Sequence, residues 1–241
     1  MKAVRHISFD VWMTLLDTRV FYREIARHLA EIKGENPETV YNIIQRGYIA
    51  VKEARRRGKI DPQNVLESSF KIAQKATDGF LAFDEVAEAV SRAVNTIDPQ
   101  SLVLDEAHVL LENLSKKYSL SVASNVVFWP GYITRTILAK TGLSKYFGVQ
   151  VYADEVCCLK PEPCMFEKLY EKTGAEVEEW VHVGDSFRED FLGALAYGLS
   201  AILIDRNRVY ARGYFKGFKA CIIGSLKEVP ACLKIFFGEK I

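Results

Sequence analysis

The sequence lacks the features that mark secreted, membrane-spanning and nucleic-acid-binding proteins. It has only five cysteines in 241 residues, an odd number without the paired spacing of a zinc site. No apolar stretch approaches the roughly 20 residues needed to cross a bilayer, and early charges and Asp10 interrupt any signal-peptide core. Neither sign of charge dominates, since 32 Lys and Arg oppose 31 Asp and Glu. We therefore expect no membrane and no nucleic-acid partner.

The cysteines bear on the cellular location of the protein and on a possible reactive thiol. Because they show no pairing pattern, we expect them to be reduced and partly buried in a cytoplasmic protein. Cys157 and Cys158 closely precede Lys160, so a reactive thiol there is the alternative to a packing role. A hydrophobic content of 49% and a charged content of 26% are ordinary for a globular protein of one large or two smaller domains. The chain is expected to be a monomer or a homodimer.

Residues 18–98 read as four amphipathic helices with short connections. Asn36-Pro37 and Asp61-Pro62 each offer a capping side chain followed by a first-turn proline. The expected helices cover residues 21–33, 37–57, 62–77 and 85–97. Such a series predicts a small helical bundle. A group of basic residues in it is predicted to be a solvated face rather than an anion site: Arg46, Lys52, Arg55, Arg56, Arg57 and Lys59.

From residue 101 onward strand and helix patterns alternate. Strands are expected at 119–125, 149–153, 180–185, 200–206 and 220–225, and helices at 105–117, 131–141, 163–173, 191–198 and 226–237. Alternation of this kind predicts a parallel sheet covered by helices on both faces. The apolar run 7–9 adds a first strand. The fold class is therefore α/β, a doubly wound Rossmann-like parallel sheet formed by residues 1–17 and 99–241, with an all-helical domain inserted at 18–98.

Polar groups follow four of the expected strands. Asp10 ends the first strand, Ser124-Asn125 ends the second, Lys160 follows the third, and Asp185 ends the fourth, with Asp190 beyond it. Ligands bind at the carboxyl ends of strands in open α/β sheets. Each residue has a simpler explanation by itself, as a helix cap, a plain turn or a surface lysine. Together, a carboxylate nucleophile, donors, a cation and a Mg²⁺-binding carboxylate favour phosphoryl transfer through an aspartyl-phosphate.

With these four segments the chain resembles the haloacid dehalogenase superfamily of hydrolases over essentially its whole length. The matching motifs are FDVWMTL, ASN, LKPEP and GDSFRED, in that order. The helical insertion is similar to the four-helix cap of the family. The resemblance implies that Asp10 is the nucleophile and also a Mg²⁺ ligand. It implies further that the Trp12 carbonyl and the Asp185 carboxylate are the other two ligands from the protein.

The resemblance also implies roles around the phosphoryl group. Ser124 and the backbone of Asn125 would bind it, and Thr14 would support the turn beside it. Lys160 would temper the charge around the nucleophile. Asp190, with Glu189 as the alternative, would orient Lys160 or a metal-bound water.

The first motif departs from the phosphatase pattern. Phosphatases of this family carry a second Asp and usually a Gly where this chain has Trp12 and Met13. The missing Asp is the general acid and base, which typically contributes roughly 10²–10⁴-fold. An aromatic residue there is similar to the Tyr of the 2-haloacid dehalogenases, which work without metal, whereas Gly184-Asp185 keeps the metal carboxylate.

We therefore expect a Mg²⁺-dependent phosphatase of small phosphorylated molecules that prefers acyl or aryl phosphates. The alternatives are a 2-haloacid dehalogenase that acts through an Asp10 ester, and a catalytically weak phosphate-binding protein. The cap residues that face the site are left open among five candidates: Arg19, Tyr22, Arg23, Arg46 and Tyr48.

Overall fold

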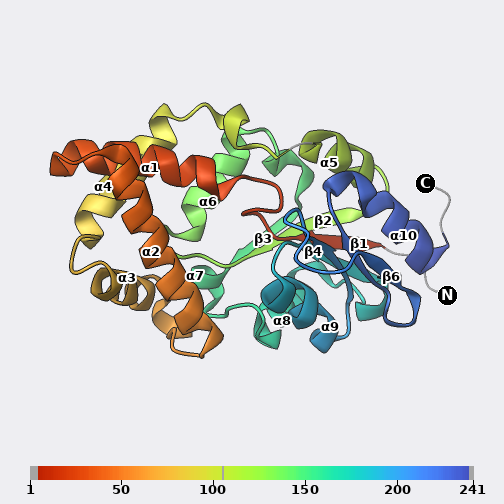
Figure 1. Cartoon of the computed structure of the whole chain (residues 1–241). Helices are drawn as coiled ribbons and strands as arrows, with labels where there is room; N and C mark the ends of the chain where they lie inside the picture. Colours follow the sequence, from red (N-terminus) through yellow and green to blue (C-terminus); the bar gives the residue numbers. More distant parts are fainter. Residues whose placement is uncertain (1–4, 105, 239–241) are drawn as a thin grey trace.

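The computed structural model describes residues 5–104 and 106–238 and is built on one seven-stranded sheet. The strand order is β3-β2-β1-β4-β5-β7-β6 (Figure 1). The strands are β1 (His6–Phe9), β2 (Ser119–Ser124), β3 (Val149–Tyr152), β4 (Trp180–Gly184), β5 (Ser200–Ile204), β6 (Gly213–Phe215) and β7 (Ala220–Ile223). All neighbouring pairs are parallel except β6 with β7. The doubly wound α/β fold predicted from the alternating pattern is confirmed.

The register of the central strands brings their carboxyl ends together. Phe9 of β1 is paired with Val122 of β2 on one side and with Val183 of β4 on the other. The residue after Phe9 therefore lies level with the ends of both neighbours. This arrangement places the polar residues that end three strands at one edge of the sheet.

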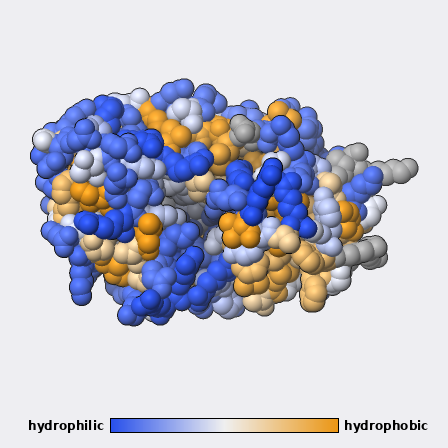
Figure 2. All heavy atoms as spheres, viewed as in Figure 1, coloured by the Kyte–Doolittle hydropathy of each residue, from blue (hydrophilic) through white to orange (hydrophobic). Residues whose placement is uncertain are grey.

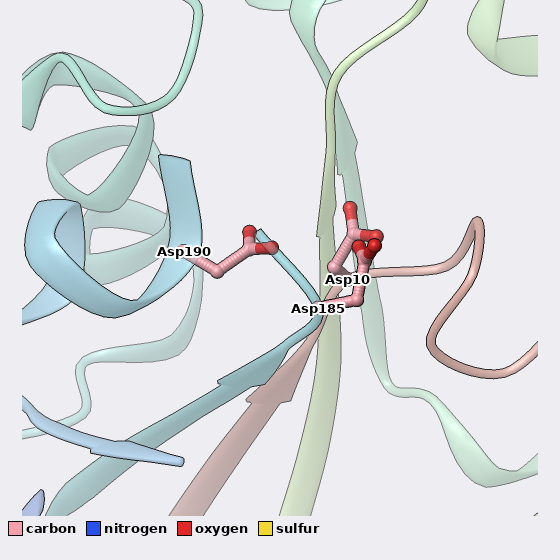
Figure 3. A group of neighbouring side chains, drawn as sticks. All are labelled: Asp10, Asp185 and Asp190. Carbon is pink, nitrogen blue, oxygen red and sulfur yellow. The ribbon is translucent and has the colours of Figure 1, made fainter. Parts of the chain in front are cut away.

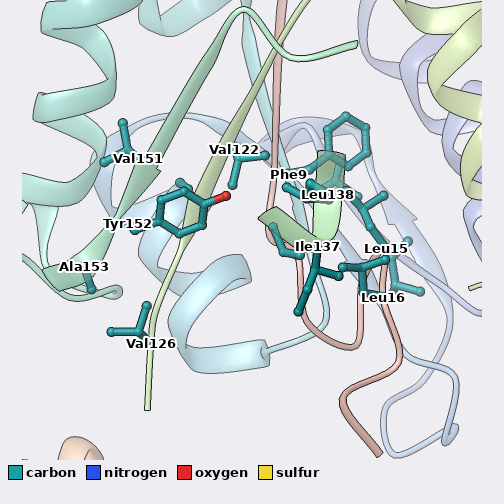
Figure 4. Close-up of a cluster of buried hydrophobic side chains, with 14 of the residues drawn as sticks. Phe9, Leu15, Leu16, Val122, Val126, Ile137, Leu138, Val151, Tyr152 and Ala153 are labelled. Carbon is teal, nitrogen blue, oxygen red and sulfur yellow. The ribbon is translucent and has the colours of Figure 1, made fainter. Parts of the chain in front are cut away.

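Helices cover both faces of the sheet. In Figure 1, α5 (Ala107–Ser115) and α10 (Val229–Phe237) lie above the strands, and α8 (Pro163–Thr173) and α9 (Gly193–Tyr197) lie below. The strands β1, β4, β5 and β7 are buried along their whole length, and the apolar side chains of the sheet form the core with those of the loop after β1 and of α6 (Gly131–Lys140). Figure 4 shows part of this core, in which Phe9, Leu15 and Leu138 are completely buried.

The segment between β1 and β2 is helical. It contains α1 (Thr18–Lys33), α2 (Pro37–Arg56), α3 (Val65–Ala76) and α4 (Phe83–Thr96), which gather at the opposite end of the molecule from α10 (Figure 1). The Asn36 side chain caps α2 by accepting hydrogen bonds from two backbone N–H groups, as its position before Pro37 predicts. Asp61 caps a short 3₁₀ turn, η1 (Pro62–Asn64), ahead of α3. In the view of Figure 2 the surface is largely hydrophilic, with hydrophobic residues in separate patches.

Two features differ from the expectations. The edge strand β6 was not predicted and pairs antiparallel with β7, because its three residues are half-exposed or exposed and give no apolar run. The cysteines are not all reduced, since Cys158 and Cys164 form a disulfide. Their Cα atoms lie 5.9 Å apart, within the usual disulfide range, because the chain folds back between them. In the described part of the chain, no helix combines the length and apolarity required of a membrane span.

Candidate active site

Asp10 lies at the carboxyl end of β1 and is nearly buried. Its backbone N–H donates to the carbonyl of Val183 at 2.9 Å, which continues the pairing with β4. Its Oδ1 accepts hydrogen bonds from Lys160 Nζ at 2.8 Å and from Ser124 Oγ at 3.2 Å. Burial raises the pKa of Asp10 to about 6, although the Lys160 ammonium opposes this effect. The carboxylate is therefore ionised at neutral pH and available as a nucleophile.

Lys160 is completely buried beneath this carboxylate. Besides Asp10, its ammonium contacts Asp190 Oδ1 at 2.6 Å and the Ala123 carbonyl at 2.5 Å. Burial alone would lower the pKa of Lys160, but the two carboxylates raise it above its ordinary value. Lys160 is thus a permanent cation between two acidic groups.

Asp190 belongs to η5 (Phe187–Leu192), a π-helical turn that follows β4. Its Oδ2 accepts the Ser186 N–H at 2.9 Å, and its Oδ1 lies 3.2 Å from His182 Nε2. The Lys160 charge lowers the pKa of Asp190 despite its burial. Gly184 makes this approach possible, because a Cβ there would lie 2.2 Å from Asp190 Cγ.

Asp185 completes an acidic cluster. In Figure 3, Asp10 and Asp185 come from the ends of adjacent strands, and Asp190 reaches toward them from η5. One oxygen of each carboxylate lies within 4.8 Å of the others. Burial and the Asp10 charge raise the pKa of Asp185 well above its ordinary range. Among the described residues nothing hydrogen-bonds to the Asp185 carboxylate. The Asp185 carboxylate and the neighbouring carboxylate of Asp10 offer hard oxygen ligands of the kind that Mg²⁺ prefers.

The second strand contributes Ser124 and Asn125, which make different contacts. The Ser124 hydroxyl points to Asp10. The Asn125 side chain brackets the backbone of Lys160, accepting its N–H at 2.9 Å and donating to its carbonyl at 3.0 Å. Asn125 also donates to Glu189 at 2.9 Å. Glu189 therefore does not contact the Lys160 ammonium; it joins Asn125 to the helical segment.

The prediction of a solvated basic face is wrong for Arg55. Its side chain is only 7% exposed, and it contacts Glu189 at 3.1 Å and the Val126 carbonyl at 3.0 Å. Lys52 lies one helical turn earlier and lines the same cavity. The run of three arginines at 55–57 concealed this contact, because sequence alone does not tell which face of α2 meets the sheet. Only the spacing of Lys52 and Arg55 on one helix face could have indicated it.

Trp12 occupies the place of the missing acid and is packed among other aromatic rings. Its indole stacks on Phe21, with ring centroids 5.5 Å apart, and meets Trp129 edge-on at 5.1 Å. The indole N–H donates to Thr134 Oγ1 at 3.2 Å. Position 12 thus supplies an apolar wall to the cavity and no titratable group.

The turn after Trp12 forms without a glycine. Met13 has a φ of +62°, the left-handed conformation that glycine adopts most easily. Arg206, beyond β5, holds this turn by donating to the carbonyls of Met13 and Thr14. The Thr14 hydroxyl lies 3.5 Å from Asp10 Oδ2, at the limit of a hydrogen bond.

The strand-end residues Asp10, Ser124 and Asp185, with Trp12 and Met13, line a cavity of about 70 Å³ between the sheet edge and the helical segment. Of the five cap candidates, Tyr22 and Tyr48 line it. The other three form ion pairs outside this cavity, Arg19 with Asp17, Arg23 with Glu38, and Arg46 with Asp78.

Comparison with known proteins identifies the family of the chain. The chain belongs to the family of haloacid dehalogenase-like hydrolases, whose model matches residues 7–204. The glyceraldehyde 3-phosphate phosphatase of Methanothermobacter thermautotrophicus is 36% identical over 96 residues, which are 40% of this chain and 41% of the relative. The chain matches about two fifths of the length of such curated relatives.

Two solved structures share the fold over nearly the whole chain. A HAD phosphatase from Thermococcus onnurineus is 27% identical, with a TM-score of 0.64 and coverage of 99% of this chain and 100% of that one. The HAD-hydrolase YfnB from Bacillus subtilis, bound to magnesium, has a TM-score of 0.75 at 20% identity and covers 96% and 99% of the two chains. The latter likeness concerns the fold alone.

Proposed function

We propose that the protein is a Mg²⁺-dependent phosphatase of small phosphorylated molecules that works through a phospho-Asp10 intermediate. The observation that carries this proposal is geometric: Asp10 is held by the buried Lys160, and one of its oxygens lies within 4.8 Å of a second carboxylate, Asp185, which forms no ion pair with any described Lys or Arg. The phosphatase activities named for the matched relatives support the choice of a phosphate substrate.

In the first step an oxygen of Asp10 attacks phosphorus. The bond from phosphorus to the leaving oxygen breaks, and that oxygen keeps the electron pair. The Ser124 hydroxyl, which donates to Asp10 Oδ1, would donate to the phosphoryl group, and Lys160 would hold the nucleophile in place. Water then attacks the phosphorus, releases inorganic phosphate and restores the carboxylate.

The metal would be held by Asp10, the Trp12 carbonyl and Asp185. When bound there, Mg²⁺ would offset the negative charge that gathers on the transferred phosphoryl group. The Asp190 carboxylate contacts the Lys160 ammonium, His182 and the Ser186 N–H, so we propose that Asp190 positions Lys160.

Trp12 restricts the leaving group. Without an acid at this position an alkoxide would depart unprotonated, so acyl and aryl phosphates should react much faster than alkyl phosphates. We would compare Mg²⁺-dependent hydrolysis of acetyl phosphate and 4-nitrophenyl phosphate with that of ethyl phosphate, with Asp10→Asn as the blank. Hydrolysis of all three with equal efficiency would refute this leaving-group rule. Activity that survives Asp10→Asn would refute the nucleophile.

A 2-haloacid dehalogenase is the second candidate, and Trp12 favours it. Halide leaves without a proton, so a site without an acid tolerates that reaction. Asp10 would then form an ester with the substrate carbon, and water would hydrolyse it. Release of chloride from 2-chloropropionate in the presence of EDTA would support this candidate over the phosphatase.

The inserted segment completes the proposal. We infer that residues 18–98 act as a cap domain over the core made by 1–17 and 99–241, since Tyr22, Tyr48, Lys52 and Arg55 all reach the cavity from it. The cytoplasmic location and the monomeric or dimeric state stay predictions, and the disulfide removes the argument from reduced cysteines.

A further inference from the structure

A groove of about 450 Å³ lies beside the catalytic cavity. The two spaces adjoin, and they share five lining residues: Met13, Lys52, Asp185, Ser186 and Glu189. The groove extends from these residues toward the loop after β5, where Asp205 and Tyr210 form its far wall. A substrate whose phosphate lies at Asp10 could therefore extend into the groove.

The groove is rich in basic side chains. Five of them line it: Arg19, Lys52, Arg56, Arg188 and Arg206. Three carboxylates also line it, but each has another role. Asp185 faces the proposed metal, Glu189 pairs with Arg55, and Asp205 accepts the Tyr210 N–H at 2.7 Å.

The five cations differ in their partners, and Arg206 is held by the carbonyls of Met13 and Thr14. Arg19 is paired with Asp17 at 2.7 Å, and Arg56 lies 3.8 Å from Glu53. In the described part of the chain, by contrast, neither Lys52 nor Arg188 forms an ion pair with a carboxylate, and the Lys52 ammonium lies over the Tyr48 ring, 5.5 Å from its centroid. Lys52 comes from α2 and Arg188 from η5, so these two cations without a carboxylate partner belong to opposite sides of the entrance, the helical segment and the sheet.

We propose that this groove binds a second anionic group, a carboxylate or a phosphate, on the part of the substrate that leaves, and that Lys52 and Arg188 recognise it. The inference rests on the proposed phosphatase function and names its substrate class: small phosphorylated molecules that carry another negative charge. Each solvent-accessible ion pair should contribute up to about fivefold to kcat/KM, and less at high salt.

The test uses aryl phosphates that differ only in the para group. These are 4-carboxyphenyl phosphate, its uncharged match 4-carbamoylphenyl phosphate, and benzene-1,4-diyl bisphosphate. Aryl leaving groups need little protonation, so the comparison does not depend on an acid at position 12. The readout is the ratio of kcat/KM for each anionic substrate to that for the carboxamide, at low and high NaCl.

We expect a ratio of about ten for at least one anionic substrate, and the carboxylate and bisphosphate arms tell which anion fits. Lys52→Met and Arg188→Met should each lower the ratio about threefold or more, and 0.5 M NaCl should lower it too. Arg46→Met is the matched control, because Arg46 also lies on α2 but faces Asp78 and lines neither space. It should leave the ratio unchanged.

The failures are distinguishable. Equal efficiency on all three substrates, or a ratio unchanged in both Lys52→Met and Arg188→Met, would overturn the inference and leave the phosphatase proposal intact. If none of the three is hydrolysed in Mg²⁺, the phosphatase proposal itself fails and the inference falls with it.

Discussion

Removal of the Lys160 ammonium should unbalance a buried charge cluster. In Lys160→Met the methionine fills most of the space, but Asp10 and Asp190 lose contacts of 2.8 and 2.6 Å. Breaking a buried ion pair from one side typically costs about 3–5 kcal/mol. For a chain of 241 residues this corresponds to a fall in Tm of roughly 10 °C.

A second substitution tests the cause. Asp190→Asn removes one of the charges that Lys160→Met leaves uncompensated. The double variant should therefore lose less stability than the sum of the two single variants, by at least about 1 kcal/mol. A merely apolar defect at Lys160 would not depend on the charge of Asp190.

The assay is urea denaturation at pH 7 with EDTA, so that no divalent cation neutralises the cluster. Lys168→Met is the matched control, because Lys168 contacts Glu171 at 2.8 Å but is 43% exposed. It should change the unfolding free energy by less than about 1 kcal/mol. If Lys160→Met is as mild as this control, or if the double variant is simply additive, the buried charges do not support one another as described.

Three further predictions concern the same end of the sheet and its core. Gly184→Ala should lower activity about 100-fold, because its Cβ would collide with Asp190, whereas Gly148→Ala, with no atom within 4 Å of its Cβ, should keep it. Burial lowers the pKa of His6 to about 4, so the unfolded chain binds more protons below pH 6.5 and stability falls as the pH drops from about 6.5 to 4. His6→Asn should reduce the slope of the unfolding free energy against pH by up to about 1.4 kcal/mol per pH unit, measured by denaturation at several pH values. An unchanged slope would contradict the assignment. Met13→Gly should be neutral or stabilising by up to about 1 kcal/mol, whereas Met13→Val should cost about 2 kcal/mol in thermal melts, because φ is positive; the opposite order would contradict the turn geometry.

The sheet and the residues at its edge could be predicted from sequence because strand ends are local signals. Apolar runs that stop at Asp10, Ser124 and Asp185 define both the strands and the polar groups after them. The carboxyl ends of adjacent parallel strands then meet without any further information. Lys160 follows from its position after the third strand, although its complete burial does not.

Contacts between the helical segment and the sheet could not be predicted in this way. Whether Arg55 faces solvent or Glu189 depends on how α2 is rotated, and its arginine neighbours obscure the amphipathic pattern. The Cys158–Cys164 disulfide depends on a loop that folds back, which spacing alone does not reveal. The groove beside the cavity is lined by residues more than 130 positions apart in the sequence, such as Lys52 and Arg188, so no local sequence pattern predicts it.

The central claim is that Asp10 is the covalent nucleophile. The direct measurement is an acid-quenched reaction with Mg²⁺ and ³²P-labelled 4-nitrophenyl phosphate, followed by peptide mapping. Because position 12 offers no base for the second step, phosphoenzyme should accumulate, with a burst approaching one nitrophenol per chain and the label on the peptide that contains Asp10. Turnover with no label at Asp10, or with the label on another residue, would contradict the account.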